Sequence, residues 1–133
     1  MTSLLPVTLC TVAALVLVNV WLSLRTRAVR RAAQVSVGDG GNEVLMRRMR
    51  AQLNFAENAP LVALLIAALE IGRIGSSWLA LAAALFVLGR VLHGFGMDGG
   101  RMQWGRVVGT VITLVMQLFL AGVAAGAVLQ RLT

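Results

Sequence analysis

Long apolar stretches alternate with short polar connections along the chain, and they lie at about residues 4–24, 43–72, 78–97 and 106–129. A helix rises about 1.5 Å per residue, so roughly 20 residues cross the hydrocarbon core of a bilayer. The pattern therefore predicts an all-α integral membrane protein, a four-transmembrane-helix bundle that forms a single domain over residues 1–133. The first stretch has no basic residue before it, so we expect a retained helix rather than a cleaved signal sequence.

The second stretch is the least regular, because only Ala59–Leu69 is continuously apolar. That run is too short to cross a bilayer alone. We therefore expect one long helix from Glu43 to Gly72, which carries Asn54 and Glu57 into the headgroup region. Pro60 follows Glu57 by about one turn and is a candidate kink.

Composition supports a membrane protein, since 59% of the residues are apolar and soluble domains have roughly 45–50%. The net charge is +7, and every basic residue is an arginine. Such a charge suits anionic lipid headgroups or an anionic substrate better than nucleic acid. Cys10 is the only cysteine, which excludes an intrachain disulfide or a cysteine metal cluster, and we expect no metal site.

The arginines predict how the helices cross the membrane. Seven of the twelve belong to the first connection, and short arginine-rich connections stay in the cytoplasm. We therefore expect the N- and C-termini on the non-cytoplasmic side. Trp21, Trp78 and Trp104 then lie near the predicted membrane interfaces, as aromatic belts do.

Polar residues follow one face of each of the last three predicted helices. They are spaced three or four residues apart, so they share a stripe on each helix. The stripes comprise Arg47, Arg50, Asn54 and Glu57; then Arg90 and His93; then Arg106, Thr110, Thr113 and Gln117. The topology brings these stripes to one depth in the cytoplasmic half, which predicts a polar cluster there.

Charge balance indicates what this cluster could do. A charged side chain at the centre of a membrane helix costs roughly 2.5–3.5 kcal/mol, so Glu57 is expected to have a cationic partner among Arg50, Arg90 and Arg106. One interpretation is that the charges only neutralise one another and fix the helix register. The surplus of arginine favours an anionic ligand, such as a carboxylate or phosphate, that matches the planar guanidinium.

Other residues carry weaker signals. His93 is the only histidine, and it fits either a packing and hydrogen-bonding role or proton transfer. Gly122 and Gly126 form a small-residue pair that indicates close contact between helices.

The sequence Arg50-Ala-Gln-Leu-Asn54-Phe-Ala-Glu57-Asn-Ala-Pro60 resembles the second-helix signature of the MAPEG family, the membrane-associated proteins of eicosanoid and glutathione metabolism. Gly89-Arg90-Val-Leu-His93 and the later Arg106 resemble the next two landmarks of that family. The loop Val37–Glu43 looks like the bacterial branch, which implies a multi-pass protein of a bacterial inner (cytoplasmic) membrane.

The resemblance implies a homotrimer that binds glutathione between neighbouring subunits near the cytoplasmic side. Arg50, Asn54 and Glu57 would contact the tripeptide, with Glu57 receiving its ammonium group and arginines its carboxylates. His93 and Arg25 would occupy neighbouring contact positions, and Arg90 belongs to the same set. Arg106 would stand where related enzymes hold the sulfur as thiolate, a role that suits a thiol of pKa about 8.5.

The leading hypothesis is therefore a glutathione-dependent transferase or peroxidase-like enzyme that acts on lipophilic electrophiles within the bilayer. The chain departs from the eicosanoid enzymes, because it contains no tyrosine and has Met97, Val107 and Thr110 where tyrosines and a serine are expected. Leu53 also replaces a frequent arginine. These departures favour a second hypothesis, a non-catalytic protein of the same fold that binds a lipid or another amphipathic anion.

A small multidrug exporter coupled to protons is a third possibility, because such proteins also use about four helices and one membrane carboxylate. That carboxylate usually lies in the first helix, which has no acidic residue here. The arginines near Glu57 would also repel cationic drugs.

Overall fold

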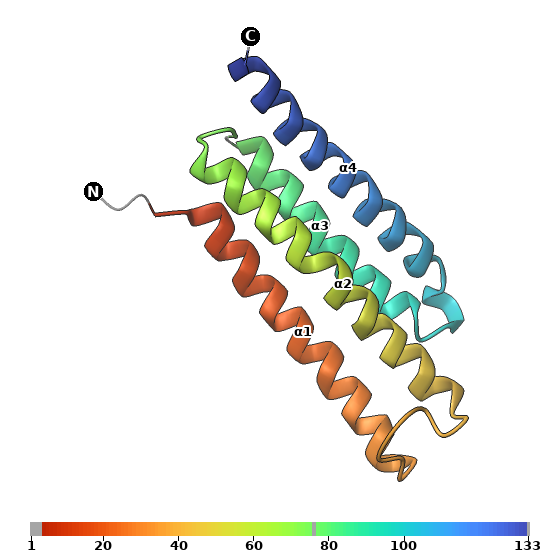
Figure 1. Ribbon diagram of the computed structural model, residues 1–133. Helices are drawn as coiled ribbons and strands as arrows, with labels where there is room; N and C mark the ends of the chain where they lie inside the picture. The colour runs from red at the N-terminus through yellow and green to blue at the C-terminus, as the bar shows by residue number, and fades with distance from the viewer. Residues whose placement is uncertain (1–3, 76, 133) are drawn as a thin grey trace.

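The computed structural model describes residues 4–75 and 77–132, which form an up-and-down bundle of long helices (Figure 1). The helices are α1 (Pro6–Ala32), α2 (Glu43–Ile71), α3 (Ser77–Gly96) and α4 (Trp104–Leu132), with a short 3-10 turn η1 (Gly100–Met102) before α4. All four long helices have the length and apolar composition needed to cross a membrane. The predicted all-α membrane fold is confirmed.

The predicted helix boundaries need correction in α1, which continues to Ala32 rather than ending near residue 24. The added turns contain Arg25, Arg27, Arg30 and Arg31, and arginine is a good helix former. Cations in a last helical turn also interact favourably with the helix dipole. In α2, Pro60 lies within an uninterrupted helix.

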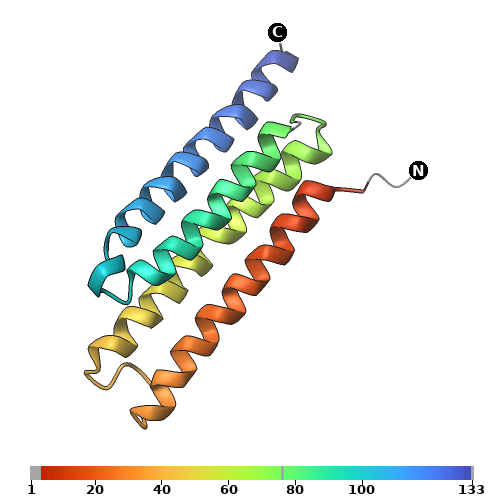
Figure 2. The same ribbon diagram turned by 180° about the vertical axis from the view of Figure 1, so that it is seen from behind.

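The helices do not all contact one another. Helices α2 and α3 each pack against the other three, whereas α1 and α4 make no contact within the described residues. The two views of the ribbon show α1 and α4 on opposite sides of the α2–α3 pair (Figure 2). Although α2 and α4 contact each other, a hollow remains open between them on one side of the bundle.

The closest packing joins α3 to α4 through glycines that lack a side chain at the crossing. A Cβ on Gly105 would lie 2.6 Å from the carbonyl oxygen of Leu92, and one on Gly109 would collide with the carbonyl of Gly89. By contrast, Gly122 and Gly126 have open space beside them. The close contact predicted at Gly122 and Gly126 is therefore wrong within the chain, because Val123 and Ala124 between them pack against the core while nothing lies beside the two glycines.

Glu70 fixes the opposite end of the bundle. Its carboxylate accepts hydrogen bonds from the backbone N–H groups of Val7 (2.9 Å) and Thr8 (2.7 Å) in the first turn of α1. The first N–H groups of a helix have no partner within the helix. Glu70 satisfies two of them and thereby ties the end of α2 to the start of α1.

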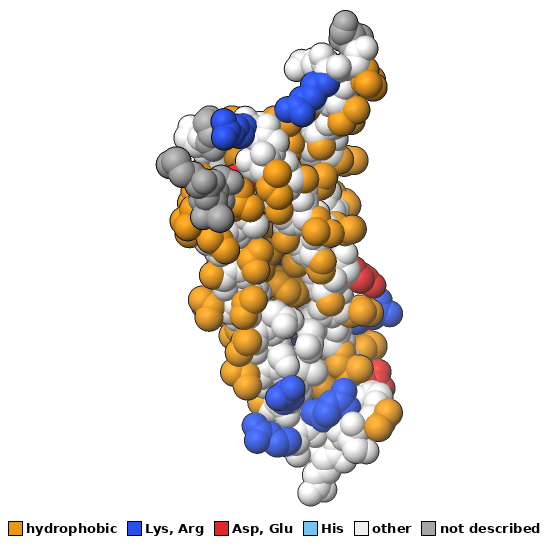
Figure 3. All heavy atoms as spheres, turned by 60° about the vertical axis from the view of Figure 1, so that its left-hand side comes forward, with side chains coloured by type: hydrophobic (Ala, Val, Ile, Leu, Met, Phe, Trp, Pro, Cys, Tyr) orange, Lys and Arg blue, Asp and Glu red, His pale blue; other side chains and the backbone are white. Residues whose placement is uncertain are grey.

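The other end carries the connections 33–42 and 97–103, and we call it the arginine-rich end. Hydrophobic side chains cover the middle of the molecular surface, and arginines gather at this end (Figure 3). Arg25 of α1 and Arg48 of α2 both bind the carboxylate of Asp98, just after α3. Arg25 also lies 4.6 Å from the centre of the Trp21 ring. This network, which we call the Asp98 cluster, connects α1, α2 and the end of α3.

Candidate functional site

A cavity of about 640 Å³, the large cavity, lies between α2, α3 and α4 towards the arginine-rich end. Its walls carry polar side chains from three helices. These side chains belong to the polar stripes that the sequence predicts. The lining residues are Met46, Arg47, Arg50, Leu53, Asn54, Glu57, His93, Met97, Arg106 and Thr110. The structure therefore gathers Arg50, Asn54, Glu57, His93 and Arg106 in one place.

Glu57 does not have the cationic partner that was expected within the chain. It is exposed, and the described residues give it no ion pair. The reason is geometric: Glu57 faces the open side of the bundle, whereas the guanidinium of Arg90 points into the core, where Asn54 binds it. The expected pairing between Glu57 and an arginine of the same chain is therefore wrong.

Arg90 is buried beneath the large cavity and does not line it. Only 1% of the residue is exposed. Its guanidinium donates to Thr113 Oγ1 (2.9 Å), Asn54 Oδ1 (2.8 Å) and His93 Nδ1 (3.2 Å). All three partners are neutral acceptors, so Arg90 orients residues of the cavity wall from behind.

The hydrogen bond from Arg90 defines the state of His93. A guanidinium only donates, so Nδ1 of His93 must accept. The proton of the neutral ring therefore sits on Nε2. His93 is buried with 4% of the residue exposed, and its hydrogen bond to Arg90 supports the packing and hydrogen-bonding interpretation.

Arg25 lies outside the large cavity. Besides Asp98, it donates to the carbonyl oxygen of Gly94 at 3.2 Å. Its position on α1 separates it from the α2–α4 opening, so within one chain Arg25 does not join the other predicted site residues.

The structure also reveals polar residues that the sequence prediction did not assign to the site. Gln117 of α4 donates to Asn58 Oδ1 (2.9 Å), and the Asn58 side chain donates to the backbone oxygen of Asn54 (2.6 Å). Gln117 belongs to the predicted α4 stripe, and Asn58 is one turn after Asn54, so helical spacing could have found both. Together with Arg90 they form a polar layer that holds Asn54 in place.

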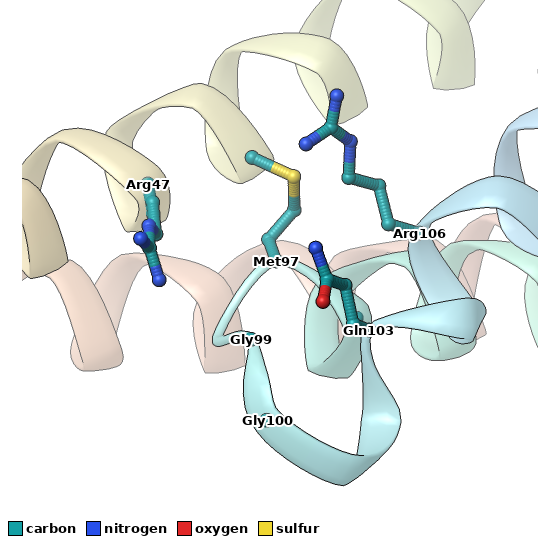
Figure 4. A pocket seen from close by; sticks show the side chains of 7 residues that line it. Arg47, Met97, Gly99, Gly100, Gln103 and Arg106 are labelled. Carbon is teal, nitrogen blue, oxygen red and sulfur yellow. The ribbon is translucent and has the colours of Figure 1, made fainter.

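A second, small cavity of about 220 Å³ adjoins the large one at the arginine-rich end. Figure 4 shows Met97 between Arg47 and Arg106, above the loop that carries Gly99 and Gly100. Arg47, Met97 and Arg106 line both cavities, whereas Gln103 lines the small one alone. Arg47 was predicted to lie in the polar cluster but not to contact the ligand, and Gln103 was not predicted at all.

The charge of this region is predominantly positive. Arg47, Arg50 and Arg106 line the large cavity with one carboxylate, Glu57. Among residues 4–75 and 77–132 there is no group of three histidine, cysteine or acidic side chains placed to hold a metal ion. The arrangement suits an organic ligand with more negative than positive charge.

Comparison with known proteins gives one result that covers most of the chain. The MAPEG family model matches residues 8–126, a range that includes every predicted site residue. No curated protein matches the sequence significantly.

Proposed function

The chain belongs to the MAPEG family, and we propose that it is a glutathione-dependent membrane enzyme, a transferase or peroxidase-like protein for lipophilic electrophiles. The observation that carries this proposal is the convergence of Arg50, Asn54, Glu57 and Arg106 on one cavity towards the arginine-rich end. Glutathione has two carboxylates, one ammonium group and one thiol. Three arginines and a single carboxylate complement that set of charges.

Each lining side chain has a distinct role in this proposal. Glu57 binds the ammonium group of glutathione. This group is the cationic partner that Glu57 lacks among the described residues. Arg50 and Arg47 bind carboxylates through their planar guanidinium groups. Arg106, whose guanidinium has no hydrogen-bond partner in the described part of the chain, stabilises the sulfur as thiolate.

The chemistry then needs no further protein nucleophile. In the transferase reaction the thiolate attacks an electrophilic carbon, a C–S bond forms, and the leaving group departs with the bonding electrons. In the peroxidase reaction the thiolate attacks the terminal oxygen of a hydroperoxide, the O–O bond breaks, and the alkoxide leaves as an alcohol after protonation. A second glutathione then reduces the resulting sulfenic acid to the disulfide and water.

We also propose that the protein works as a homotrimer in a bacterial inner membrane, with the arginine-rich end in the cytoplasm. Arg50 and Glu57 are exposed on the open α2–α4 side, and uncovered charge at this depth is costly. A neighbouring copy would cover that side. Glutathione would lie between subunits, where Arg25 of the neighbour's α1 would be a further contact through N–H groups that Asp98 and Gly94 do not use.

The alternative is a non-catalytic protein that binds a lipid or another amphipathic anion in the same cavity. Its specific support is the wall near Arg106, which has Met97 and Thr110 and no phenol to donate a hydrogen bond, because the chain lacks tyrosine. In this case the cavity would hold an anion without activating a thiol.

Calorimetry of glutathione binding in detergent tests the proposal. The parent protein should bind, and Arg50→Ala and Glu57→Gln should both weaken binding, while Arg101→Ala serves as a charge control because Arg101 lines neither cavity. Turnover of an aryl halide or a lipid hydroperoxide above a detergent blank then tests catalysis. Binding without turnover favours the non-catalytic alternative, and absence of both rejects glutathione as the ligand.

A further inference from the structure

The small cavity is a candidate site in its own right because part of its wall is separate from the large cavity. Gln103 and the loop residues Gly99 and Gly100 line only the small cavity. The two cavities meet at Arg106 and Arg47. A ligand in the small cavity would therefore sit beside the large cavity and nearer to the loop.

The lining of the cavity carries positive charge and no acidic side chain. Among the described residues that line it, two are arginines and none is acidic. Within the part of the chain that the structure describes, Arg47 forms an ion pair only with Glu43, one turn away (3.1 Å), and both side chains face solvent. Such an exposed pair contributes little, so the Arg47 guanidinium remains available to a ligand.

The neighbouring acid in the loop cannot neutralise these arginines. Asp98 is occupied by Arg25 and by Arg48 Nε at 3.3 Å. The Asp98 cluster thereby occupies the carboxylate of the loop. Among the described residues, Arg106 then has no ion pair, and Arg47 has only its exposed pair with Glu43.

The loop is shaped so that Arg47 can lie against its backbone. Gly99 and Gly100 adopt left-handed conformations, with φ of +83° and +66°, which other residues rarely adopt. A Cβ on Gly99 would lie 3.0 Å from Arg47 Nη1. Glycine at this position leaves room for the guanidinium, and the loop wall of the cavity has no side chains at these two positions.

We propose that the small cavity binds a phosphate group, presented either by inorganic phosphate or by the headgroup of an anionic phospholipid. Arg47 and Arg106 supply planar guanidinium donors that match phosphate oxygens, and the Gln103 amide supplies a further N–H donor. Basic pockets between transmembrane helices bind anionic headgroups in this way. The site does not depend on glutathione, since a guanidinium has five N–H donors and Arg106 can serve both cavities.

Two binding measurements on the full-length protein test the proposal and identify the source of the phosphate. Calorimetry with inorganic phosphate measures the free anion. Reconstitution into phosphatidylcholine vesicles with or without phosphatidylglycerol, followed by native mass spectrometry of retained lipid, measures the headgroup. The variants are Arg47→Lys, Gln103→Ala and the charge control Arg101→Ala, each checked for helicity and for monodispersity in detergent.

We expect Gln103→Ala and Arg47→Lys to weaken phosphate binding about tenfold, as expected for the loss of one hydrogen bond to a charged group, with Arg101→Ala unchanged. If these two variants weaken only the binding of inorganic phosphate, the site binds the free anion. If they reduce the retention of phosphatidylglycerol, the site binds a lipid headgroup. Equal weakening by Arg101→Ala would overturn the proposal, because general surface charge would then explain binding. No binding by the parent in either arm would also overturn it.

A negative result for the phosphate site can be distinguished from a negative result for the proposed glutathione-dependent enzyme. Glutathione calorimetry on the same samples reports the large cavity, which Gln103 does not line. Glutathione binding without phosphate binding would reject the phosphate site alone. Phosphate binding without glutathione binding would reject the proposed cofactor and keep the phosphate site.

Discussion

The arginine-rich end contains two groups of charged residues that differ in how their charges are balanced. In the Asp98 cluster, Arg25 and Arg48 share one carboxylate and also bind backbone oxygens. In the large cavity, Arg50, Glu57 and Arg106 have no ion-pair partner among the described residues. Arg25 and Arg48 therefore have a carboxylate partner and connect helices, whereas Arg50 and Arg106 have none among the described residues and are available to a ligand.

Among substitutions that test this comparison, Arg106→Ala in the large cavity is expected to have the largest effect, a loss of catalytic rate. Removing a group that stabilises charge in the transition state costs about 2.7–4 kcal/mol, or roughly 100- to 1,000-fold in rate. Steady-state turnover of an aryl halide with glutathione checks this, alongside the thiolate absorbance of bound glutathione. A variant that kept both full turnover and the thiolate signal would contradict the role given to Arg106.

Glu57→Gln should separate ligand binding from stability. A hydrogen bond to a charged group contributes about 1.5–3 kcal/mol, so glutathione affinity should fall about 10- to 100-fold. The free protein should change by less than about 0.5 kcal/mol, because Glu57 is exposed and has no ion pair to lose. Calorimetry and thermal unfolding in detergent measure the two quantities. Unfolding at a clearly lower temperature would mean that Glu57 has a structural partner.

Asp98→Asn should show the opposite result. It leaves Arg25 and Arg48 without their shared carboxylate in a half-buried setting, so the free energy of unfolding should fall by about 1–2 kcal/mol, between the values for exposed and buried pairs. Thermal unfolding in detergent measures the loss. Glutathione affinity should change less than in Glu57→Gln. An equal or larger fall in affinity would mean that the Asp98 cluster also contributes to glutathione binding.

Glu70→Gln should give the smallest effect, at the far end of the bundle. One amide oxygen replaces two carboxylate oxygens, so one N–H group in the first turn of α1 loses its partner, at about 1 kcal/mol. Glu43→Gln is a suitable control, because its exposed pair with Arg47 contributes only about 0.3–0.5 kcal/mol. Hydrogen exchange at Val7 and Thr8 localises the effect. Equal protection in both variants would argue against this link between the helices.

Much of the fold and of the large cavity could be predicted, because both follow from local periodicity. Spacing of three and four residues placed Asn54, Glu57 and Arg106 on stripes, and helix packing then brought the stripes together. Side-chain direction was harder to predict. Arg90 lies on the same kind of stripe as His93, yet its longer side chain reaches the core, where Asn54 and Thr113 satisfy it.

Partners far apart in sequence could not be predicted by the same means. Arg25 and Asp98 are separated by 73 positions, and nothing in the local spacing of either indicates that they meet. Glycine pairs were similarly ambiguous. Gly122 and Gly126 have the small-residue spacing, but the close approach of α3 and α4 occurs at Gly105 and Gly109, because contact depends on where the neighbouring helix lies.

The glycine contacts between α3 and α4 have a mechanical consequence. Gly105 and Gly109 place no side chain between the two backbones, so we expect α3 and α4 to move together as one rigid unit. His93 and Arg106 belong to these two helices, so the distance between their backbones should stay constant. The opposite wall of the large cavity belongs to α2, so we expect the width of the cavity to depend on how α2 lies relative to the α3–α4 unit.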